Sequence, residues 1–237
     1  MTTLHILAAG SLRGVWPDLM TTFHHQSGLT TDTHFGPAGL LRQRIERGEH
    51  CDLFASANLQ HPATLLQRGL AIHTGKFAAN SLCLTANRDV VTENDTWLSL
   101  LHRDDLRLAT STPLSDPSGD YTWQLFDNIE QVYPGCGERL KQHARQLVGG
   151  VDSLAVPTGE LAAQWLIDQQ HADLFIGYAS YAARLINHPH LQVLSIPEPF
   201  NIQAEYGWAT FTHSANPLAA FLSTTAARAI LQQNGFA

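Results

Sequence analysis

Four short segments rich in glycine, alanine and serine stand out, because each directly precedes a stretch with a helical pattern. They are Ala8-Ala9-Gly10-Ser11, Gly36-Pro37-Ala38-Gly39, Asp116-Pro117-Ser118-Gly119 and Pro157-Thr158-Gly159-Glu160. A helix start presents backbone N–H groups without a partner inside the helix, together with the positive end of the helix dipole. Small residues let an anion approach these N–H groups closely. The segments therefore predict the binding of an anion by uncharged donors.

A simpler interpretation is that each segment only caps a helix, since Ser, Asp and Gly are common capping residues. Any one segment alone is explained in this way. Four of them in one chain, alternating with strands, favour a shared anion site. Charge-assisted hydrogen bonds contribute on the order of 1.5 to 3 kcal/mol each, so five or six could give micromolar affinity or tighter.

The segments lie in a chain of alternating strand and helix patterns. In the first part, strands are expected at Leu4–Ala9, Leu29–Phe35, Asp52–Ala57 and Ser81–Ala86, and helices at Leu12–His25, Leu40–Arg47 and Pro62–Gly69. In the second part, strands Leu106–Thr110 and Asp173–Tyr178 accompany helices Tyr121–Val132, Glu138–Leu147 and Glu160–Gln169. Strands Leu191–Ile196 and Tyr206–Phe211 and helices from Pro217 follow. Helical crossovers imply parallel strands, whose following loops meet at one sheet edge.

Length and composition fit a well-packed α/β protein. A chain of 237 residues suits two lobes of roughly 100 residues each, although one large domain is the alternative. We expect residues 1–83 and 193–237 to form lobe I and residues 84–192 to form lobe II. The net charge of -7 and only 14 scattered Lys and Arg residues argue against nucleic acid or an acidic membrane surface as partner. No stretch approaches the roughly 18 apolar residues that span a bilayer.

The whole chain resembles the molybdate-binding proteins of ABC importers, which are class II periplasmic binding proteins. The segments that carry the resemblance are Ala8–Leu12, Leu40–Glu46 with Gly48, Asp52–Ala57, Asn80–Leu82, Pro117–Tyr121, Ile176–Ser180, and Ala226-Ala227 with Gly235-Phe236. Of these, the Ala-Gly-Ser-Leu start and Asp-Leu-Phe-Ala-Ser-Ala are specific only in combination. The resemblance implies a two-lobe type II fold, with a mainly parallel sheet flanked by helices in each lobe and a ligand cleft between the lobes.

The resemblance also implies which residues hold the ligand. The family binds its anion with Ser hydroxyls, backbone amides and one Tyr hydroxyl. Transferred by motif, Ser11 with Gly10 provides a hydroxyl and amide, and Tyr178 provides the phenol. Ser118 and either Gly159 or Glu160 provide amides from the second lobe.

Two positions depart from the family pattern. The family's second serine-rich segment is Gly36-Pro37-Ala38-Gly39 here, so one hydroxyl is absent and Pro37 has no N–H to donate. The amides of Ala38 and Gly39 remain as donors. Glu160 would repel a dianion, and we expect its side chain to turn to solvent at a helix start. Arg13 and Arg42 are the cations expected nearest the ligand, and if they face it, the ligand is larger than a bare oxyanion.

Several other residues could suggest a metal site or a catalytic site, but each has a simpler explanation. His24, His25 and His188-Pro189-His190 suggest a metal, but they have no carboxylate or thiol partner at ligand spacing, so no free cation and no cofactor are expected. The Ser11 segment is not a Gly-x-Ser-x-Gly elbow, and Asp116 is explained by capping, so no catalytic residue and no enzyme are expected. Cys51, Cys83 and Cys136 are expected to be reduced. Pro17 is expected to shorten or bend the first helix.

We therefore expect a monomeric solute-binding protein that captures molybdate or tungstate in a cleft and delivers it to an ABC permease. The binding residues expected are Gly10, Ser11, Ala38, Gly39, Ser118, Gly159, Glu160 and Tyr178. Sulfate or a small organic acid is the alternative ligand. A signal peptide is not seen, so the chain is expected to be a mature periplasmic form or cytoplasmic. A cytoplasmic sensor domain of the same fold, as in LysR-type regulators, is the alternative from another class.

Overall fold

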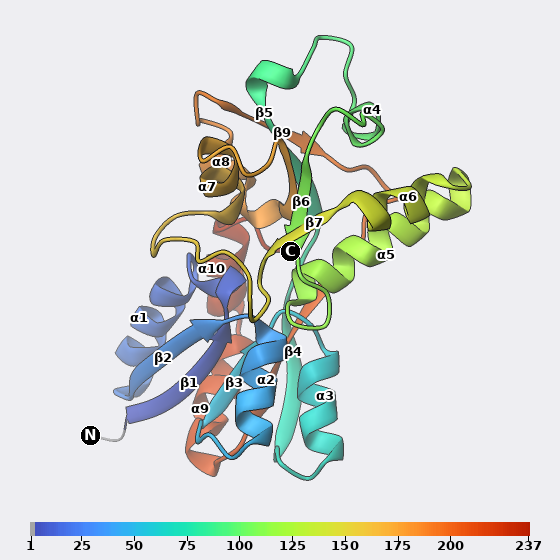
Figure 1. The fold of residues 1–237 in the computed structure, drawn as a ribbon. Helices are drawn as coiled ribbons and strands as arrows, with labels where there is room; N and C mark the ends of the chain where they lie inside the picture. The colour runs from blue at the N-terminus through green and yellow to red at the C-terminus, as the bar shows by residue number, and fades with distance from the viewer. Residues whose placement is uncertain (1–2) are drawn as a thin grey trace. The chain divides into compact units, whose positions relative to one another are not determined.

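The computed structural model describes residues 3–237, which divide into two compact α/β units (Figure 1). Unit 1 contains the described residues up to Asn80 together with Ala204–Ala237, and unit 2 contains Ser81–Gln203. The chain therefore passes between the units twice. The expectation that residues 193–203 return to the first lobe is wrong, because the strand at Leu191–Ser195 pairs inside the sheet of unit 2.

Unit 1 is built on a five-stranded sheet with the order β2-β1-β3-β10-β4. Its strands are β1 (Thr3–Ala9), β2 (Thr30–Gly36), β3 (Leu53–Ser56), β4 (His73–Asn80) and β10 (Ala204–Thr210). β1 pairs in parallel with β2 and β3, and only β10 runs against its two neighbours. β1 and β2 are the strands that lead into the first two small-residue segments. They therefore end at the same edge of the sheet.

The helices of unit 1 pack in two groups on this sheet. They are η1 (Gly10–Leu12), α1 (Trp16–Ser27), α2 (Ala38–Glu46), α3 (Gln60–Gln67), η4 (His213–Ala215), α9 (Asn216–Leu222) and α10 (Thr225–Gln233). α2 and α3 contact each other and strands β1, β3, β4 and β10, whereas α1, α9 and α10 contact one another and strands β2, β4 and β10 (Figure 1). Buried side chains such as Trp16, Phe23, Leu19 and Phe54 fill the space between helices and sheet.

Unit 2 repeats the plan with a five-stranded sheet of order β7-β6-β8-β5-β9. Its strands are β5 (Leu82–Asn87), β6 (Leu108–Ser111), β7 (Arg145–Val148), β8 (Leu174–Tyr178) and β9 (Leu191–Ser195). β6 is parallel to β7 and β8, and β5 is antiparallel to β8 and β9. In each unit, the reversed strand is the one that directly follows a passage of the chain from the other unit.

The helices of unit 2 include the longest one described. They are η2 (Arg88–Val90), α4 (Trp97–Leu101), α5 (Pro117–Val132), α6 (Cys136–His143), α7 (Ala162–Asp168), η3 (Ala179–Tyr181) and α8 (Ala182–Leu185). α5 and α6 pack together, and α7 packs against β5 and β8. A core of Leu161, Leu166, Phe175, Leu185 and Leu191 links α7 and α8 to the sheet. α6 approaches α5 closely at Gly137, where a Cβ would lie 2.1 Å from the carbonyl oxygen of Phe126.

Several predicted boundaries are wrong for local reasons. The first helix does not begin at Leu12, because a short η1 turn precedes α1 and Pro17 occupies the first turn of α1, where a missing N–H matters least. The helix predicted at Glu138–Leu147 ends at His143, and Arg145–Val148 forms strand β7 instead. The helix predicted from Glu160 begins at Ala162. Strand β4 and helix α4 were not predicted.

Candidate functional site

The carboxyl ends of β1 and β2 bring two of the small-residue segments together in unit 1. Ala9 and Gly36 are register partners at the ends of these parallel strands. The residues that follow, Gly10-Ser11 and Pro37-Ala38, therefore leave the sheet side by side. A Cβ on Gly10 would lie 3.8 Å from the carbonyl oxygen of Gly36. We call Gly10, Ser11, Ala38 and Gly39 the unit 1 edge.

Ser11 is held in place by a buried phenol. The hydroxyl of Tyr206, on β10, donates a hydrogen bond to Ser11 Oγ at 2.9 Å. Tyr206 has no exposed surface, and its ring meets those of Phe77 and Phe236 edge-on, with centroids 6.2 and 5.4 Å apart. A hydroxyl that accepts a hydrogen bond still has its own proton to donate. Ser11 can therefore donate to an anion at this edge.

The start of α2 supplies backbone donors beside Ser11. Pro37 is the N-cap, and the first intrahelical bond runs from the Leu41 N–H to the Pro37 carbonyl at 2.9 Å. The N–H groups of Ala38 and Gly39 precede that bond and so have no acceptor inside the helix. Within residues 3–237, no side chain caps this helix. Ala38 and Gly39 are both small and buried, so the nine-residue helix presents bare amides and its positive dipole end.

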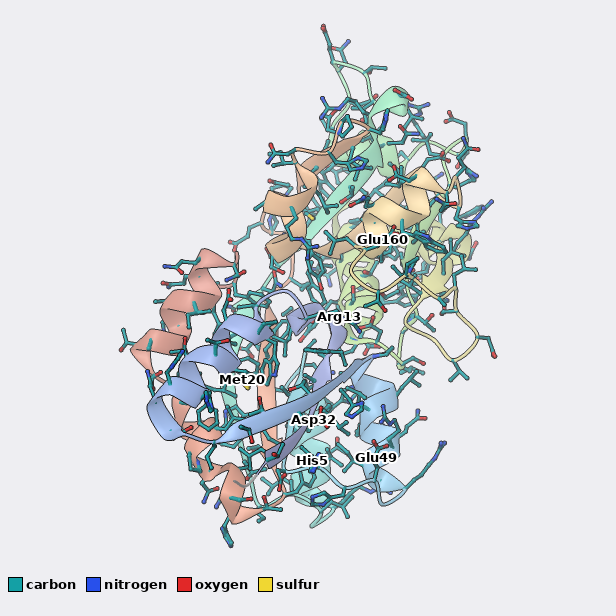
Figure 2. All side chains as sticks on the ribbon, turned by 90° about the vertical axis from the view of Figure 1, so that its left-hand side faces the viewer. His5, Arg13, Met20, Asp32, Glu49 and Glu160 are labelled. Atoms are coloured by element: carbon teal, nitrogen blue, oxygen red, sulfur yellow. The ribbon has the colours of Figure 1, made fainter. Side chains whose placement is uncertain are left out.

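The two arginines considered at this edge have different surroundings. Arg13 is exposed just after η1, and its Cζ lies 5.2 Å from the ring centroid of Phe35, near the end of β2 (Figure 2). Its charge therefore lies close to the unit 1 edge. Arg42 is instead tied between α2 and α3, with Nε 3.4 Å from Glu46 Oε1 and a hydrogen bond of 3.2 Å to His61 Nδ1. Burial, reinforced by the Arg42 charge, lowers the pKa of His61 to about 4, so this ring is neutral at pH 7.

The corresponding edge of unit 2 is occupied by a carboxylate. Asp116 is the N-cap of α5 and accepts a hydrogen bond from the Ser118 N–H at 3.1 Å. The simpler interpretation of Asp116 as a helix cap is confirmed. The Ser118 amide was expected to bind the ligand, but it already donates to the Asp116 carboxylate. At this helix start the carboxylate takes the place that an anion would have. Burial, with a smaller contribution from the nearby Asp120 carboxyl, raises the pKa of Asp116 to about 6.

Gly159 and Glu160 lie in an exposed turn rather than at a helix start. Gly159 has a φ of +93°, and the Glu160 N–H donates to the Pro157 carbonyl at 3.1 Å. The N-cap of α7 is Leu161, so the helix begins after this turn. Figure 2 shows Glu160 in the loop ahead of α7, and its side chain is exposed. The expectation of a helix start at Glu160 is wrong because the Gly159 turn uses the amide that would have faced a ligand.

Tyr178 is the last residue of β8 and is buried with 4% of its surface exposed. β8 is parallel to β6, which ends at Ser111, so Tyr178 shares the carboxyl edge that leads to α5. The structure thus places Tyr178 and Ser118 at the same edge of the unit 2 sheet. Ser11, Ala38 and Gly39 meet at the edge of the unit 1 sheet.

The histidines and cysteines have ordinary surroundings. His24 Nδ1 lies 2.9 Å from the Leu29 carbonyl oxygen, and His188 Nε2 lies 3.4 Å from Asp168 Oδ2. Among residues 3–237 no group of three His, Cys, Asp or Glu side chains is placed to hold a metal ion. Cys51, Cys83 and Cys136 are free thiols, and burial raises the pKa of both Cys51 and Cys83 to about 12.

Sequence reasoning missed Tyr206 and Phe35. Tyr206 lies 195 positions after Ser11 and looks like an ordinary strand aromatic. No spacing rule connects the two residues. Only the antiparallel placement of β10 beside β3 brings the phenol under the loop after β1.

Comparison with known proteins agrees with this architecture. Residues 4–237 match the sequence profile of the bacterial extracellular solute-binding proteins. The chain belongs to this family. This solute-binding protein is 47% identical over 235 residues to an uncharacterized protein of Pasteurella multocida (strain Pm70), covering 98% of both chains.

Two solved structures share the fold of this solute-binding protein. The periplasmic molybdate-binding protein of Azotobacter vinelandii superposes with a TM-score of 0.79 at 19% identity, covering 99% of this chain and 98% of that one. The sulfate-binding protein SubI of Mycobacterium tuberculosis gives a TM-score of 0.81 at 16% identity, covering 100% and 86%. The type II periplasmic-binding-protein fold expected from the sequence is confirmed. Across residues 3–237, no helix is both long and apolar enough to cross a bilayer.

Proposed function

We propose that this solute-binding protein captures a tetrahedral dianionic oxyanion, molybdate or tungstate first, and delivers it to an ABC permease. The observation that carries the proposal is the unit 1 edge, where the Ser11 hydroxyl lies beside the uncapped start of α2. Ser11, Ala38 and Gly39 supply uncharged donors to a fully ionised ligand. Such donors stabilise a dianion without requiring a buried countercharge.

We further propose that the Tyr178 phenol, at the carboxyl edge of the unit 2 sheet, is a donor to an anion. Neither the Ser118 amide nor the Glu160 amide is part of this proposal, since each already has an acceptor. Replacing Tyr178 by Phe should then weaken anion binding by less than the replacement of Ser11 by Ala. An unchanged affinity in both variants would show that the site is assigned wrongly.

A second candidate ligand is an anion with an additional acidic group, such as a small organic acid or an organic phosphate. Arg13 favours this candidate, because its guanidinium lies over Phe35 next to the unit 1 edge. The Gly36–Gly39 segment has no serine hydroxyl and Pro37 has no N–H, which also reduces the donors available to a bare oxyanion. Sulfate is the alternative among the simple oxyanions.

The test is thermal unfolding of the purified chain with molybdate, tungstate, sulfate, phosphate and small carboxylates. A ligand at about a hundred times its dissociation constant adds roughly 2.7 kcal/mol, or on the order of 5 to 10 °C for a chain of this size. Shifts with molybdate and tungstate alone would support the first proposal. A shift only with a carboxylate or with sulfate would replace it by the corresponding alternative. Recovery of the ligand unchanged would agree with a binding rather than catalytic role.

We propose that the chain acts in the periplasm as a monomer. The extracellular character of the family supports the proposed compartment. Cell fractionation tests the compartment, and size-exclusion chromatography with light scattering tests the oligomeric state. Recovery in the cytoplasm would favour the alternative of a ligand-sensing domain.

A further inference from the structure

The hydrogen bond between Tyr206 and Ser11 has a direction. The phenol donates and Ser11 Oγ accepts, at 2.9 Å. A serine hydroxyl can either donate to a ligand or accept from it, and its rotation decides which. Because the phenol donates to Ser11, the Ser11 proton cannot be given to Tyr206 and needs another acceptor, which a ligand at the unit 1 edge can supply.

The phenol is held firmly in this arrangement. Tyr206 is completely buried in the middle of β10, and its ring is fixed by edge-on contacts with Phe77 and Phe236. Its main chain pairs with Ala78 of β4, and the next residue, Gly207, pairs with Ser56 of β3. The tyrosine therefore cannot turn to follow a ligand, and Ser11 must adapt to the tyrosine.

We propose that Tyr206 is a positioning residue that keeps Ser11 a hydrogen-bond donor, and that the site thereby selects anions whose bound oxygens carry no proton. Molybdate and sulfate present only acceptor oxygens. Hydrogen phosphate has a similar tetrahedral shape but carries a proton, which would face another donor if it met Ser11 or the α2 amides. This inference rests on the proposed function, because it concerns the selectivity of the same edge.

The experiment measures the affinities of molybdate, sulfate and inorganic phosphate at pH 8 by calorimetry on the full chain. At this pH all three ions are mainly dianions, so charge does not separate them. The variants are Tyr206→Phe, Ser11→Ala and the double variant. Thr33→Val is the matched control, because it removes the acceptor of the Trp16 Nε1–H hydrogen bond, 3.1 Å long, in the same unit. The stability of each ligand-free variant is measured by urea unfolding.

In Tyr206→Phe, Ser11 can rotate and accept a proton from hydrogen phosphate. We expect the preference of the wild type for molybdate or sulfate over phosphate to fall by about tenfold. The double variant should match Ser11→Ala in its selectivity, because Tyr206 acts only through Ser11. Thr33→Val should keep the wild-type preference even if it unfolds more easily.

The outcomes separate the two proposals. If the wild type binds molybdate or sulfate and Tyr206→Phe weakens all three ions equally, the phenol has only a structural role and this inference is overturned. The same conclusion follows if the double variant has lower selectivity than Ser11→Ala. If the wild type binds none of the three ions, the proposed function itself fails and this inference falls with it. If Tyr206→Phe does not fold, a Ser11→Ala variant that keeps the wild-type preference overturns the inference.

Discussion

At the scale of single residues, charge is distributed unevenly over the two candidate edges. Arg13 lies exposed over Phe35 in unit 1, whereas Asp116 and Asp120 lie at the start of α5 in unit 2. The chain carries a net charge of -7, so attraction of an anion must be local. Arg13 is the side chain placed to provide that attraction at the unit 1 edge.

Replacing Arg13 by Gln should weaken the binding of a dianion by about 0.5 to 1 kcal/mol, because the guanidinium is exposed and its field is screened. The effect should be larger at low ionic strength than at high ionic strength. Calorimetry at two salt concentrations measures both the loss and its salt dependence. Arg47→Gln is the matched control, since Arg47 is an exposed arginine at the far end of α2. Equal effects of the two substitutions would show that Arg13 acts only through net charge.

Asp116 should make the folded state less stable as pH rises, because its carboxyl group is harder to ionise in the folded chain than in the unfolded chain. Burial raises its pKa in the folded chain to about 6, above the ordinary value of 3.8 for an aspartate. Between these values the folded chain keeps the proton and the unfolded chain loses it. The contribution of Asp116 to stability is therefore complete below about pH 4 and decreases as pH rises to about 6, by about 1 kcal/mol per pH unit.

Asp116→Asn should remove this slope while keeping an oxygen that accepts from the Ser118 N–H. Urea unfolding of wild type and variant from pH 4 to pH 7 measures the difference. The variant should gain stability relative to the wild type as pH rises through this window. Asp18→Asn, on the exposed first turn of α1, is the control. A difference that does not change with pH would contradict the assigned burial of the carboxyl group.

At the scale of elements, the helices that begin at the two candidate edges, α2 and α5, differ in their caps. α5 has a carboxylate cap, which satisfies its first amides and complements its dipole. α2 begins after Pro37, and none of the described side chains caps it. Water or a ligand must therefore complete the hydrogen bonds of Ala38 and Gly39. This contrast favours α2 over α5 as the helix start in the proposed anion site.

Ala38→Pro tests the α2 start without breaking the helix. Proline is favoured at the first helical position, and the ψ of 127° at Pro37 suits a residue that precedes proline. The substitution removes one N–H, so anion affinity should fall by about 1 to 3 kcal/mol. Circular dichroism and urea unfolding check that the helix and the fold remain intact. Thr225→Pro, at the exposed first position of α10, should leave affinity unchanged. A folded Ala38→Pro variant with wild-type affinity would exclude this amide from the site.

At the scale of the whole molecule, the chain leaves unit 1 after Asn80 and returns at Ala204. Within each unit, the residues at these two crossing points are neighbours. In unit 1, Asn80 and Ala204 are direct partners in the antiparallel ladder of β4 and β10. In unit 2, the Asn201 side chain donates to the Leu82 and Ile196 carbonyls and accepts from the Leu82 N–H. Unit 2 is thus one continuous segment inserted between two residues, Asn80 and Ala204, that pair directly in the sheet of unit 1.

Unit 1 should therefore fold when residues 81–203 are replaced by Asn-Gly. Two residues of this type form the tight turn that joins directly paired antiparallel strands. We expect a cooperative urea transition and the circular dichroism of an α/β protein. An Ala-Ala link should be less stable by about 1 kcal/mol, because alanine tolerates the positive φ of this turn poorly. The absence of a cooperative transition in the Asn-Gly chain would contradict the independence of unit 1.

The sequence alone determined the features that depend on local pattern. Alternating strands and helices predicted the α/β class, and small residues after strands predicted the loops at the unit 1 edge. Ser11 and the Ala38–Gly39 helix start were found in this way, because parallel pairing forces such loops to one edge. Tyr178 was placed at the end of its strand for the same reason.

Only the tertiary structure decided features that depend on distant partners. β9 joins unit 2 because it pairs with β5, more than a hundred residues earlier, which no local pattern reports. The Ser118 and Glu160 amides have the right sequence surroundings, yet a cap and a turn already use them. Tyr206 reaches Ser11 only because β10 returns antiparallel beside β3. A hydrogen bond is decided by which atoms the packed chain brings within about 3 Å, so its direction could not be read from residue types alone.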